Sequence, residues 1–181
     1  MNKRNEIIVL GGGCFWCTEA AFQMLRGVQS VTSGYAGGTV SHPTYEMVCQ
    51  GDTGHAEVVM VMYDANEITL EEILSVFFAI HDPTTLNRQG DDIGTQYRSI
   101  ILFSKEEERG KISSYIQRLE QERVFDHPIV TEVRKLDIFF PAEVGHSRYF
   151  ERFSEQPYCR TIISPKLAKL RKKFHKLMVS K

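Results

Sequence analysis

The order of strand-type and helix-type segments constrains the fold of this chain more than any other feature of its sequence. Short apolar or alternating runs predict strands, and apolar residues spaced three or four apart predict the helices between them. Two strand–helix–strand units follow one another, which predicts an α/β (α+β) fold: a two-layer sandwich with a ferredoxin-like split βαβ plait. The six segments are residues 6–10, 14–25, 28–35, 56–63, 69–80 and 97–103.

Further elements follow this plait. Capping boxes, from Thr69 to Glu72 and from Ser104 to Glu107, predict where two helices begin. The helix that begins at Ser104 is predicted to continue to about residue 123. After it we expect a strand at 129–136, a short helix at 143–153 and a helical extension from 165. No repeat and no linker divides the chain, so we expect one domain at residues 1–164.

Two long loops, residues 36–55 and 81–96, interrupt the predicted elements. Loops of this length inside a compact domain usually carry function. The second loop enters a strand through residues 88–99, which are dense in hydrogen-bonding groups. The adjacent Asp91 and Asp92 could bind Mg²⁺ or Ca²⁺, but a role in a turn is the simpler interpretation because neighbouring side chains in extended backbone diverge.

Length and composition place the chain among globular proteins. Its 181 residues are 42% hydrophobic and 25% charged, which is ordinary for one folded domain and excludes disordered and collagen-like classes. No apolar run reaches about 18 residues, so we expect no transmembrane helix. The apolar run at 7–10 is too short for the core of a signal peptide, and we therefore expect a cytoplasmic location.

The C-terminal segment, residues 165–181, differs in charge from the rest of the chain. It carries seven Lys or Arg residues and no acid, whereas the remainder carries 15 basic and 23 acidic side chains, a formal charge of −8. Basic amphipathic helices bind membrane surfaces, nucleic acids or calmodulin-like grooves. Because body and tail have opposite charges, we expect instead a helix that packs its apolar face on the same domain. The apolar residues at helical spacing are Leu167, Leu170, Phe174 and Leu177.

Cysteine content points to thiol chemistry. In a reducing compartment, cysteines are more often catalytic, metal-binding or inert than joined in structural disulfides. Cys14 and Cys17 form a C-x-x-C pair, which is typical of a redox-active dithiol. Tetrahedral zinc needs four ligands, and no second pair has metal-binding spacing, so we expect no metal. The four cysteines are Cys14, Cys17, Cys49 and Cys159.

Cys14 follows three glycines at the predicted junction between a strand and a helix. The N-terminus of a helix offers unpaired N–H groups and the positive end of the helix dipole, and both favour a thiolate over a thiol. The sequence therefore predicts a nucleophile at Cys14. A buried, inert cysteine is the alternative interpretation.

Glu57 lies at the start of a predicted strand, between Ala56 and Val58. A carboxyl group in apolar surroundings has a raised pKa and stays protonated near neutral pH, as a general acid requires. An outward-facing strand glutamate is the alternative, and this segment alone does not separate the two.

Taken together, these segments resemble the methionine sulfoxide reductase A family. The resemblance covers residues 5–165, with several separate motifs in the right order. The matching segments are GGGCFWCTEAAF at 11–22, GYAGG at 34–38, PTYEMVCQGDTGHAE at 43–57, HDPTT at 81–85, RQGDDIGTQYRS at 88–99 and QPYC at 156–159.

The resemblance implies a role for each matching residue. The family's nucleophile falls on Cys14, and the acid that protonates the sulfoxide oxygen falls on Glu57. Phe15 and Trp16 match the aromatic pair that encloses the substrate methyl group. The polar residues that match those holding the sulfoxide oxygen or its water are Tyr45, Asp92 and Tyr97. An ionised Glu57 beside Cys14 opposes thiolate formation, so we expect the two to titrate jointly.

The resolving cysteine is left open between two candidates. Cys159 stands where the family commonly carries a resolving cysteine in a C-terminal loop, and Pro157 favours a non-helical segment there. Cys17, where the family often has glycine, lies within one helical turn of Cys14. We favour Cys159, with Cys17 as its competitor or as a relay thiol. Cys49 matches a family position without a catalytic role, and we expect it to serve packing.

The implied function is reduction of the S epimer of methionine sulfoxide, free or in oxidised proteins, by a monomer with no bound cofactor. A sulfenic acid on Cys14 condenses to a disulfide, which thioredoxin reduces, and the result is repair of oxidative damage. The alternative enzyme is a general C-x-x-C disulfide oxidoreductase. A metal- or nucleic-acid-binding module is the alternative outside enzymology, and the acidic body argues against binding to nucleic acid.

Overall fold

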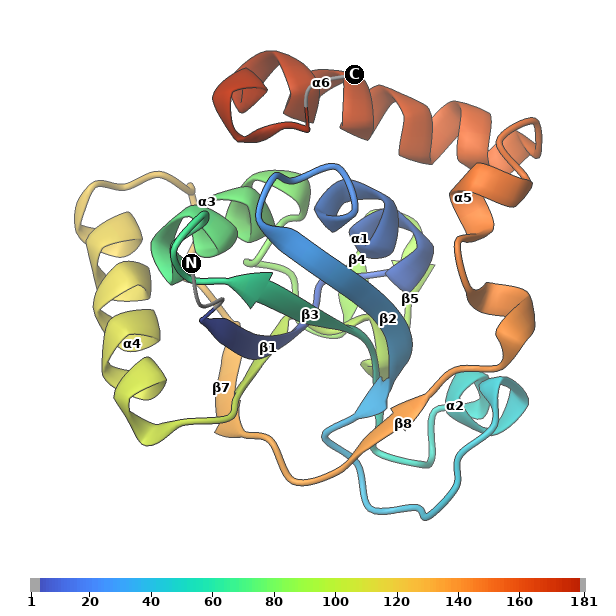
Figure 1. The fold of residues 1–181 in the computed structure, drawn as a ribbon. Coiled ribbons are helices and arrows are strands. Elements are labelled where there is room, and N and C mark those ends of the chain that lie inside the picture. The colour runs from blue at the N-terminus through green and yellow to red at the C-terminus, as the bar shows by residue number, and fades with distance from the viewer. Residues whose placement is uncertain (1–3, 180–181) are drawn as a thin grey trace.

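A computed structural model describes residues 4–179 and forms a six-stranded sheet with helices packed on it (Figure 1). The strand order is β7-β6-β1-β3-β2-β8. The strands are β1 Asn5–Gly11, β2 Val28–Ala36, β3 Ala56–Asp64, β6 Ile100–Phe103, β7 Glu132–Lys135 and β8 Phe139–Pro141, with β4 Arg88–Gln89 and β5 Asp92–Ile93 as a separate pair. The helices are α1 Phe15–Phe22, α2 Tyr45–Gln50, α3 Leu70–Ile80, α4 Glu106–Gln121, α5 Tyr149–Arg152 and α6 Ser164–Lys173.

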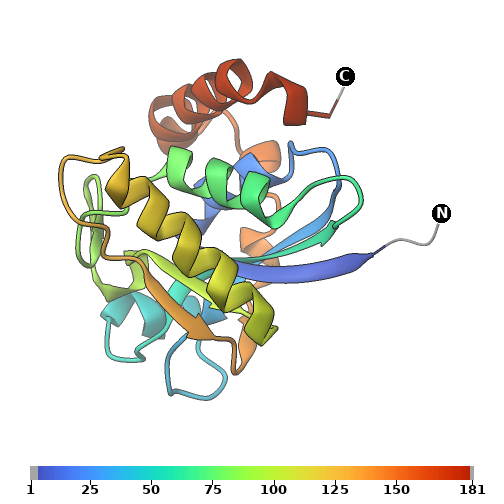
Figure 2. The same cartoon turned by 90° about the vertical axis from the view of Figure 1, so that its left-hand side faces the viewer.

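The four central strands confirm the predicted split βαβ plait. Their order is β6-β1-β3-β2, and every neighbouring pair among them is antiparallel. That order follows when the helices of two strand–helix–strand units pack on the same face of one sheet. The helices of the two units are α1 and α3, which contact each other, and α4 lies beside α3 (Figure 2). The sheet is then extended at both edges, by β7 parallel to β6 and by β8 antiparallel to β2.

Side chains of the central strands are buried on both faces of the sheet. Ile8 and Leu10 contribute to the large core under the helices, whereas Val9 between them belongs to a smaller cluster on the opposite face. Successive side chains of a strand point to opposite faces, so both clusters draw on the same strand. A strand buried on both sides reads as a continuous apolar run, which explains the lack of alternation at the start of the chain.

The capping box of α3 is confirmed, and that of α4 is shifted by one residue. Thr69 Oγ1 accepts a hydrogen bond from the backbone N of Glu72 at 3.2 Å, and the Glu72 carboxylate accepts one from the backbone N of Thr69 at 2.8 Å. In α4 the Glu108 carboxylate accepts hydrogen bonds from the backbone N of Ser104 and of Lys105. The prediction that Glu107 has this role was therefore wrong, and the helix begins at Glu106.

The first long loop contains a short helix that the sequence analysis did not predict. Thr44 is the N-cap of α2 and accepts from the backbone N of Met47 at 3.3 Å, and Gly51 ends the helix with a left-handed φ of 84°. Six residues are too few to show an apolar period of 3.6. The predicted strand at 97–103 begins only at Ile100, because residues 95–97 form a 3₁₀ turn. β8 was not predicted either.

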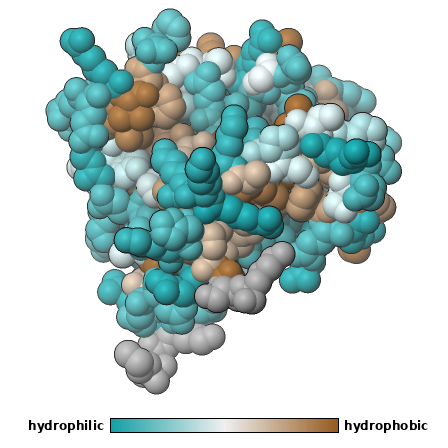
Figure 3. Space-filling model, turned by 90° about the horizontal axis from the view of Figure 1, so that it is seen from above, coloured by the Kyte–Doolittle hydropathy of each residue, from teal (hydrophilic) through white to brown (hydrophobic). Residues whose placement is uncertain are grey.

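The C-terminal helix α6 lies against α1 and α3. Leu167 and Leu170 are buried in the main core, and the surface on the side where α6 lies is mostly hydrophilic (Figure 3). A π-helical turn, Cys159–Ile163, leads directly into α6. The prediction that Cys159 lies in a non-helical segment was therefore wrong. No helix among residues 4–179 is both long and apolar enough to cross a membrane.

We expect the substitution Leu170→Ala to lower the free energy of unfolding by about 2–5 kcal/mol, because it opens a cavity in a packed core. The neighbouring Lys169 is exposed, so Lys169→Ala is the matched control and should change stability by less than about 0.5 kcal/mol. Urea denaturation of both variants measures the difference. Equal stabilities would show that α6 contributes nothing to the core.

Candidate active site

The turn between β1 and α1 contains two glycines, Gly12 and Gly13, that the surrounding structure requires. A Cβ atom on Gly12 would lie 2.9 Å from the His81 ring, so no larger residue fits there without a shift. Gly13 has a φ of 92°, a left-handed conformation that favours glycine. This turn places Cys14 at the N-cap of α1, as the sequence predicted.

The first turn of α1 is tied to β3 by one buried hydrogen bond. The backbone N of Phe15 donates to Glu57 Oε2 at 3.0 Å. Glu57 stands opposite Tyr35 in the antiparallel β2–β3 pair, and only 1% of its surface is exposed. Burial raises the pKa of Glu57 to about 8, against the opposing effect of the Phe15 N–H. At pH 7 the carboxyl group is therefore largely protonated.

The thiols of Cys14 and Cys17 interact directly. Burial raises the pKa of Cys14, and a hydrogen bond with Cys17 and the charge of Glu57 raise it further. The same hydrogen bond is the main cause of the lowered pKa of Cys17. The expectation that the helix N-terminus favours a thiolate at Cys14 was therefore wrong in direction, whereas the expectation that the charge of Glu57 opposes the thiolate is confirmed. Desolvation, Cys17 and the charge of Glu57 outweigh the helix dipole at Cys14.

Two tyrosine hydroxyls lie within electrostatic reach of Glu57. Tyr45 comes from the first turn of α2, and Tyr97 from the 3₁₀ turn before β6. Burial is the main cause that raises the pKa of each hydroxyl, and Glu57 contributes to both. Both hydroxyls are therefore protonated at physiological pH.

Asp92 of β5 is hydrogen-bonded to Tyr158, which was not among the predicted site residues. Tyr158 donates its hydroxyl proton to Asp92 Oδ2 at 3.0 Å, and the same hydroxyl lies 3.9 Å from Cys17 Sγ. Tyr158 therefore links the second long loop to the C-x-x-C pair. The segment QPYC at 156–159 contains Tyr158, so its neighbourhood was visible in the sequence, whereas its partners were not.

Aromatic rings surround the first turn of α1. Phe15 is buried, and Trp16 is partly exposed with its ring 6.5 Å from that of Phe15. Trp16 stacks on Tyr149 at a centroid distance of 3.7 Å and an interplanar angle of 5°. The indole Nε1 of Trp16 donates to His146 Nδ1 at 3.2 Å. No sequence signal identifies His146 or Tyr149, because both lie far from Trp16 along the chain.

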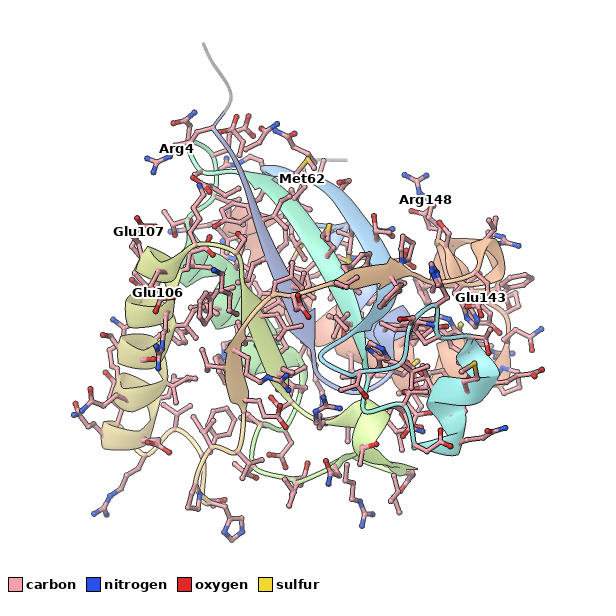
Figure 4. All side chains as sticks on the ribbon, turned by 90° about the horizontal axis from the view of Figure 1, so that it is seen from below. Arg4, Met62, Glu106, Glu107, Glu143 and Arg148 are labelled. Carbon is pink, nitrogen blue, oxygen red and sulfur yellow. The ribbon has the colours of Figure 1, made fainter. Side chains whose placement is uncertain are left out.

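Glu143 connects the segment that contains these rings to α2. Its carboxylate accepts from the Tyr35 hydroxyl at 2.8 Å and from the backbone N of Tyr45 at 2.7 Å. Figure 4 shows Glu143 beside α2, on the segment that leads to Arg148. One carboxylate thus connects the segment that carries His146 and Tyr149 to β2 and α2.

The four cysteines are all free, and their surroundings differ. Cys159 has no exposed surface, and burial raises its pKa, with a further contribution from the charge of Cys17. Cys49 is exposed on α2, where it interacts with the Tyr45 hydroxyl. Among residues 4–179, no group of three or more His, Cys, Asp or Glu side chains is arranged to hold a metal ion.

The fold and the site define a thiol-dependent oxidoreductase. A C-x-x-C pair lies at a helix N-terminus, beside a protonated carboxyl group and two hydroxyl donors. Such a set can attack a sulfur centre on one side and protonate its leaving oxygen on the other.

Comparisons with known proteins specify this class. The family described as "Peptide methionine sulfoxide reductase" matches residues 6–178. A peptide methionine sulfoxide reductase MsrA of Acinetobacter baumannii (strain AYE) is 55% identical over 170 residues, or 94% of this chain and 96% of the relative. The chain belongs to the peptide methionine sulfoxide reductase family, and it is a methionine sulfoxide reductase.

Solved structures agree with this assignment. The reduced form of Mxr1 from Saccharomyces cerevisiae superposes with a TM-score of 0.79 at 32% identity, over 88% of this chain and 91% of that one. Methionine sulfoxide reductase A of Corynebacterium diphtheriae gives a TM-score of 0.74 at 33% identity, over 82% of this chain and 75% of that one.

Replacing the buried carboxyl group should change how stability depends on pH. In the folded protein Glu57 keeps its proton up to about pH 8, whereas an ordinary carboxyl group loses it near 4.5. Between these two pKa values the folded state binds more protons than the unfolded state. The free energy of unfolding of the wild type therefore falls as the pH rises from about 5 to about 8. We expect Glu57→Gln to be more stable than the wild type above pH 8, by about 4–5 kcal/mol.

Urea denaturation at pH 5, 7 and 9 measures this difference. The exposed Glu155 provides the matched control, because Glu155→Gln should follow the wild type at every pH. A constant difference between Glu57→Gln and the wild type across this range would contradict a raised pKa at Glu57.

Proposed function

We propose that Cys14 and Glu57 carry out the reductive step on the S epimer of methionine sulfoxide, free or in oxidised proteins. The observation that supports this most is the hydrogen bond from the backbone N of Phe15 to Glu57 Oε2, at 3.0 Å. It places a neutral carboxyl group beside the residue that follows the nucleophile. A thiol and a proton donor are then available on two sides of one small ligand.

The chemistry balances with groups of this chain. Cys14 Sγ attacks the sulfoxide sulfur, while Glu57 protonates the sulfoxide oxygen and the hydroxyls of Tyr45 and Tyr97 donate hydrogen bonds to it. The new bond between Sγ and the substrate sulfur and the S–O bond of the substrate then break as the OH group passes to Sγ, so that Cys14 becomes a sulfenic acid and the substrate leaves as methionine. The proton lost by the Cys14 thiol replaces the one that Glu57 gave. Phe15 and Trp16 enclose the substrate methyl group.

The sulfenic acid on Cys14 then condenses with a second thiol, giving a disulfide and water. Cys17 has the shortest path, since its thiol already interacts with that of Cys14. Cys159 is the second candidate for this thiol. The charge of Cys17 contributes to the raised pKa of Cys159, and the neighbouring Tyr158 contacts the Cys17 sulfur. We propose that the disulfide ends on Cys159, directly or by way of Cys17.

An external dithiol completes the cycle by exchange, and we propose thioredoxin for this role. Mxr1 of Saccharomyces cerevisiae has been solved in complex with Trx2. We further propose that the protein acts as a cytoplasmic monomer in protein repair after oxidative damage, without a bound cofactor. Residues 1–164 are its catalytic domain and residues 165–181 a helix packed on it. Residues 1–3 and 180–181 of these segments lie outside the described residues.

Cysteine variants separate the reductive step from recycling. Cys14→Ser should form no methionine at all. Cys159→Ser should release one methionine per enzyme at the wild-type rate, but its turnover with thioredoxin should fall by more than about tenfold, because the disulfide that thioredoxin reduces is no longer formed. Single-turnover and steady-state assays measure the two rates, with Cys49→Ser as a control that retains both.

The same assays assign the resolving thiol. Unchanged recycling in Cys159→Ser together with lost recycling in Cys17→Ser would move the role to Cys17. Reaction of Cys14→Ser at the wild-type rate would refute the proposed nucleophile.

The proton of Glu57 should make the reductive step depend on pH. We expect the single-turnover rate with the S epimer to fall as pH rises through about 8, because Glu57 loses its proton there. Glu57→Gln should be slower by about 10²–10⁴-fold. A stereochemically resolved assay should show no reaction with the R epimer. If Glu57→Gln kept full reductase activity while Cys17→Ser abolished disulfide exchange, a general C-x-x-C disulfide oxidoreductase would be the better description.

A further inference from the structure

Trp16 forms one wall of the proposed substrate site, and a segment from the other end of the chain sets its position. Tyr149 stacks on one face of the indole, and His146 Nδ1 accepts a hydrogen bond from the indole Nε1 at 3.2 Å. The His146 ring also lies 5.3 Å from that of Phe15 and 4.5 Å from that of Tyr45. His146 therefore contacts three groups that the proposed reaction uses.

The tautomer of His146 is fixed by its surroundings. To accept from Trp16, Nδ1 must be unprotonated and the proton must be on Nε2. His146 Nε2 lies 3.9 Å from the Glu143 carboxylate, which favours a proton at that nitrogen. Glu143 is held in turn by the Tyr35 hydroxyl and by the backbone N of Tyr45.

The segment around His146 is anchored at both ends. Glu19 of α1 accepts from the backbone N of Arg148 at 3.1 Å, so the segment is attached to the helix that carries Trp16. Arg152 donates from NH1 to the backbone oxygens of Val144 and Ser147. A ring held by such contacts can fix a neighbouring side chain with little loss of entropy on substrate binding.

We propose that His146 is a positioning residue for the reductase site, which holds the Trp16 indole in the orientation that receives the substrate methyl group. This proposal rests on the proposed role of Trp16 as a wall of the substrate site. His146 acts through Trp16 and touches no reacting atom. The neutral imidazole is the active form, because a protonated Nδ1 becomes a donor and cannot accept from the indole.

Protonation of His146 in acid therefore breaks the hydrogen bond between the Trp16 indole and His146 Nδ1. Burial lowers the pKa of His146, and the charge of Glu143 opposes this shift. The groups that face the imidazole are Glu143 from its own segment, the Tyr45 ring from α2, and Phe15 and Trp16 from α1. The contact is present at neutral pH and is lost as the pH falls through the pKa of His146, and substrate binding should weaken over the same range.

Intrinsic fluorescence tests the contact without any turnover, because Trp16 is the only tryptophan of the chain. We expect the emission of the reduced, substrate-free wild type to titrate in mildly acid solution. His146→Asn, whose side-chain oxygen replaces Nδ1 as acceptor, should show no such titration. The exposed His127 provides the matched control, and His127→Asn should titrate like the wild type. A wild-type titration in His146→Asn would overturn the proposal.

Single-turnover kinetics test the consequence for substrate. At neutral pH, His146→Leu should raise the substrate concentration for half-maximal rate about fivefold to tenfold, with little change in the maximal rate. His146→Asn should stay within about twofold of the wild type, because the acceptor is restored. In a Trp16→Phe background, which lacks the indole N–H, adding His146→Leu should change nothing further.

The double substitution separates positioning from a general structural role. If His146→Leu weakened substrate binding equally in the wild-type and Trp16→Phe backgrounds, His146 would not act through the indole, and the proposal would fail. His146→Asn carries the test if His146→Leu does not fold. Loss of the proposed reductase chemistry is detected separately, as failure of the wild type to convert the S epimer, whereas the fluorescence titration does not depend on that chemistry.

Discussion

The hydrogen bond from the backbone N of Phe15 to the Glu57 carboxyl group is the interaction on which the rest of the site depends. It joins the first turn of α1 to β3 inside the core, where a carboxyl group is stable only if it is neutral or fully bonded. The N–H donates to one of the two carboxyl oxygens, Oε2. The same burial that keeps Glu57 protonated also raises the pKa of Cys14, and the charge of Glu57 raises that pKa further.

The central plait could be predicted from the sequence because local patterns determine it. Apolar runs, glycines and the capping box at Thr69 mark four strands and two helices, and their order allows few topologies. The short elements α2 and β8 could not be predicted, since three to six residues carry no period. They form because longer elements already present an edge or a surface to them.

In the site, too, features set by neighbouring residues in the sequence could be predicted, and contacts between distant segments could not. The N-cap position of Cys14 followed from the three glycines, whereas the apolar neighbours of Glu57 left its burial undecided until the structure showed it. The direction of the pKa shift at Cys14 was wrong, because the helix dipole was visible in the sequence and the burial was not. Contacts between Trp16 and His146, or Cys17 and Tyr158, join residues 130 or more positions apart, and no local pattern reports them.

The π-helical turn that contains Cys159 limits how other molecules reach the thiol of this residue. Its sulfur has no surface in contact with solvent, and the turn continues without a break into the basic helix α6. A macromolecule therefore reaches this atom only while the turn is transiently unwound. In the recycling proposed for Cys159, the frequency of such openings, a property of local stability and hence of temperature, limits how fast that thiol reacts with an external partner.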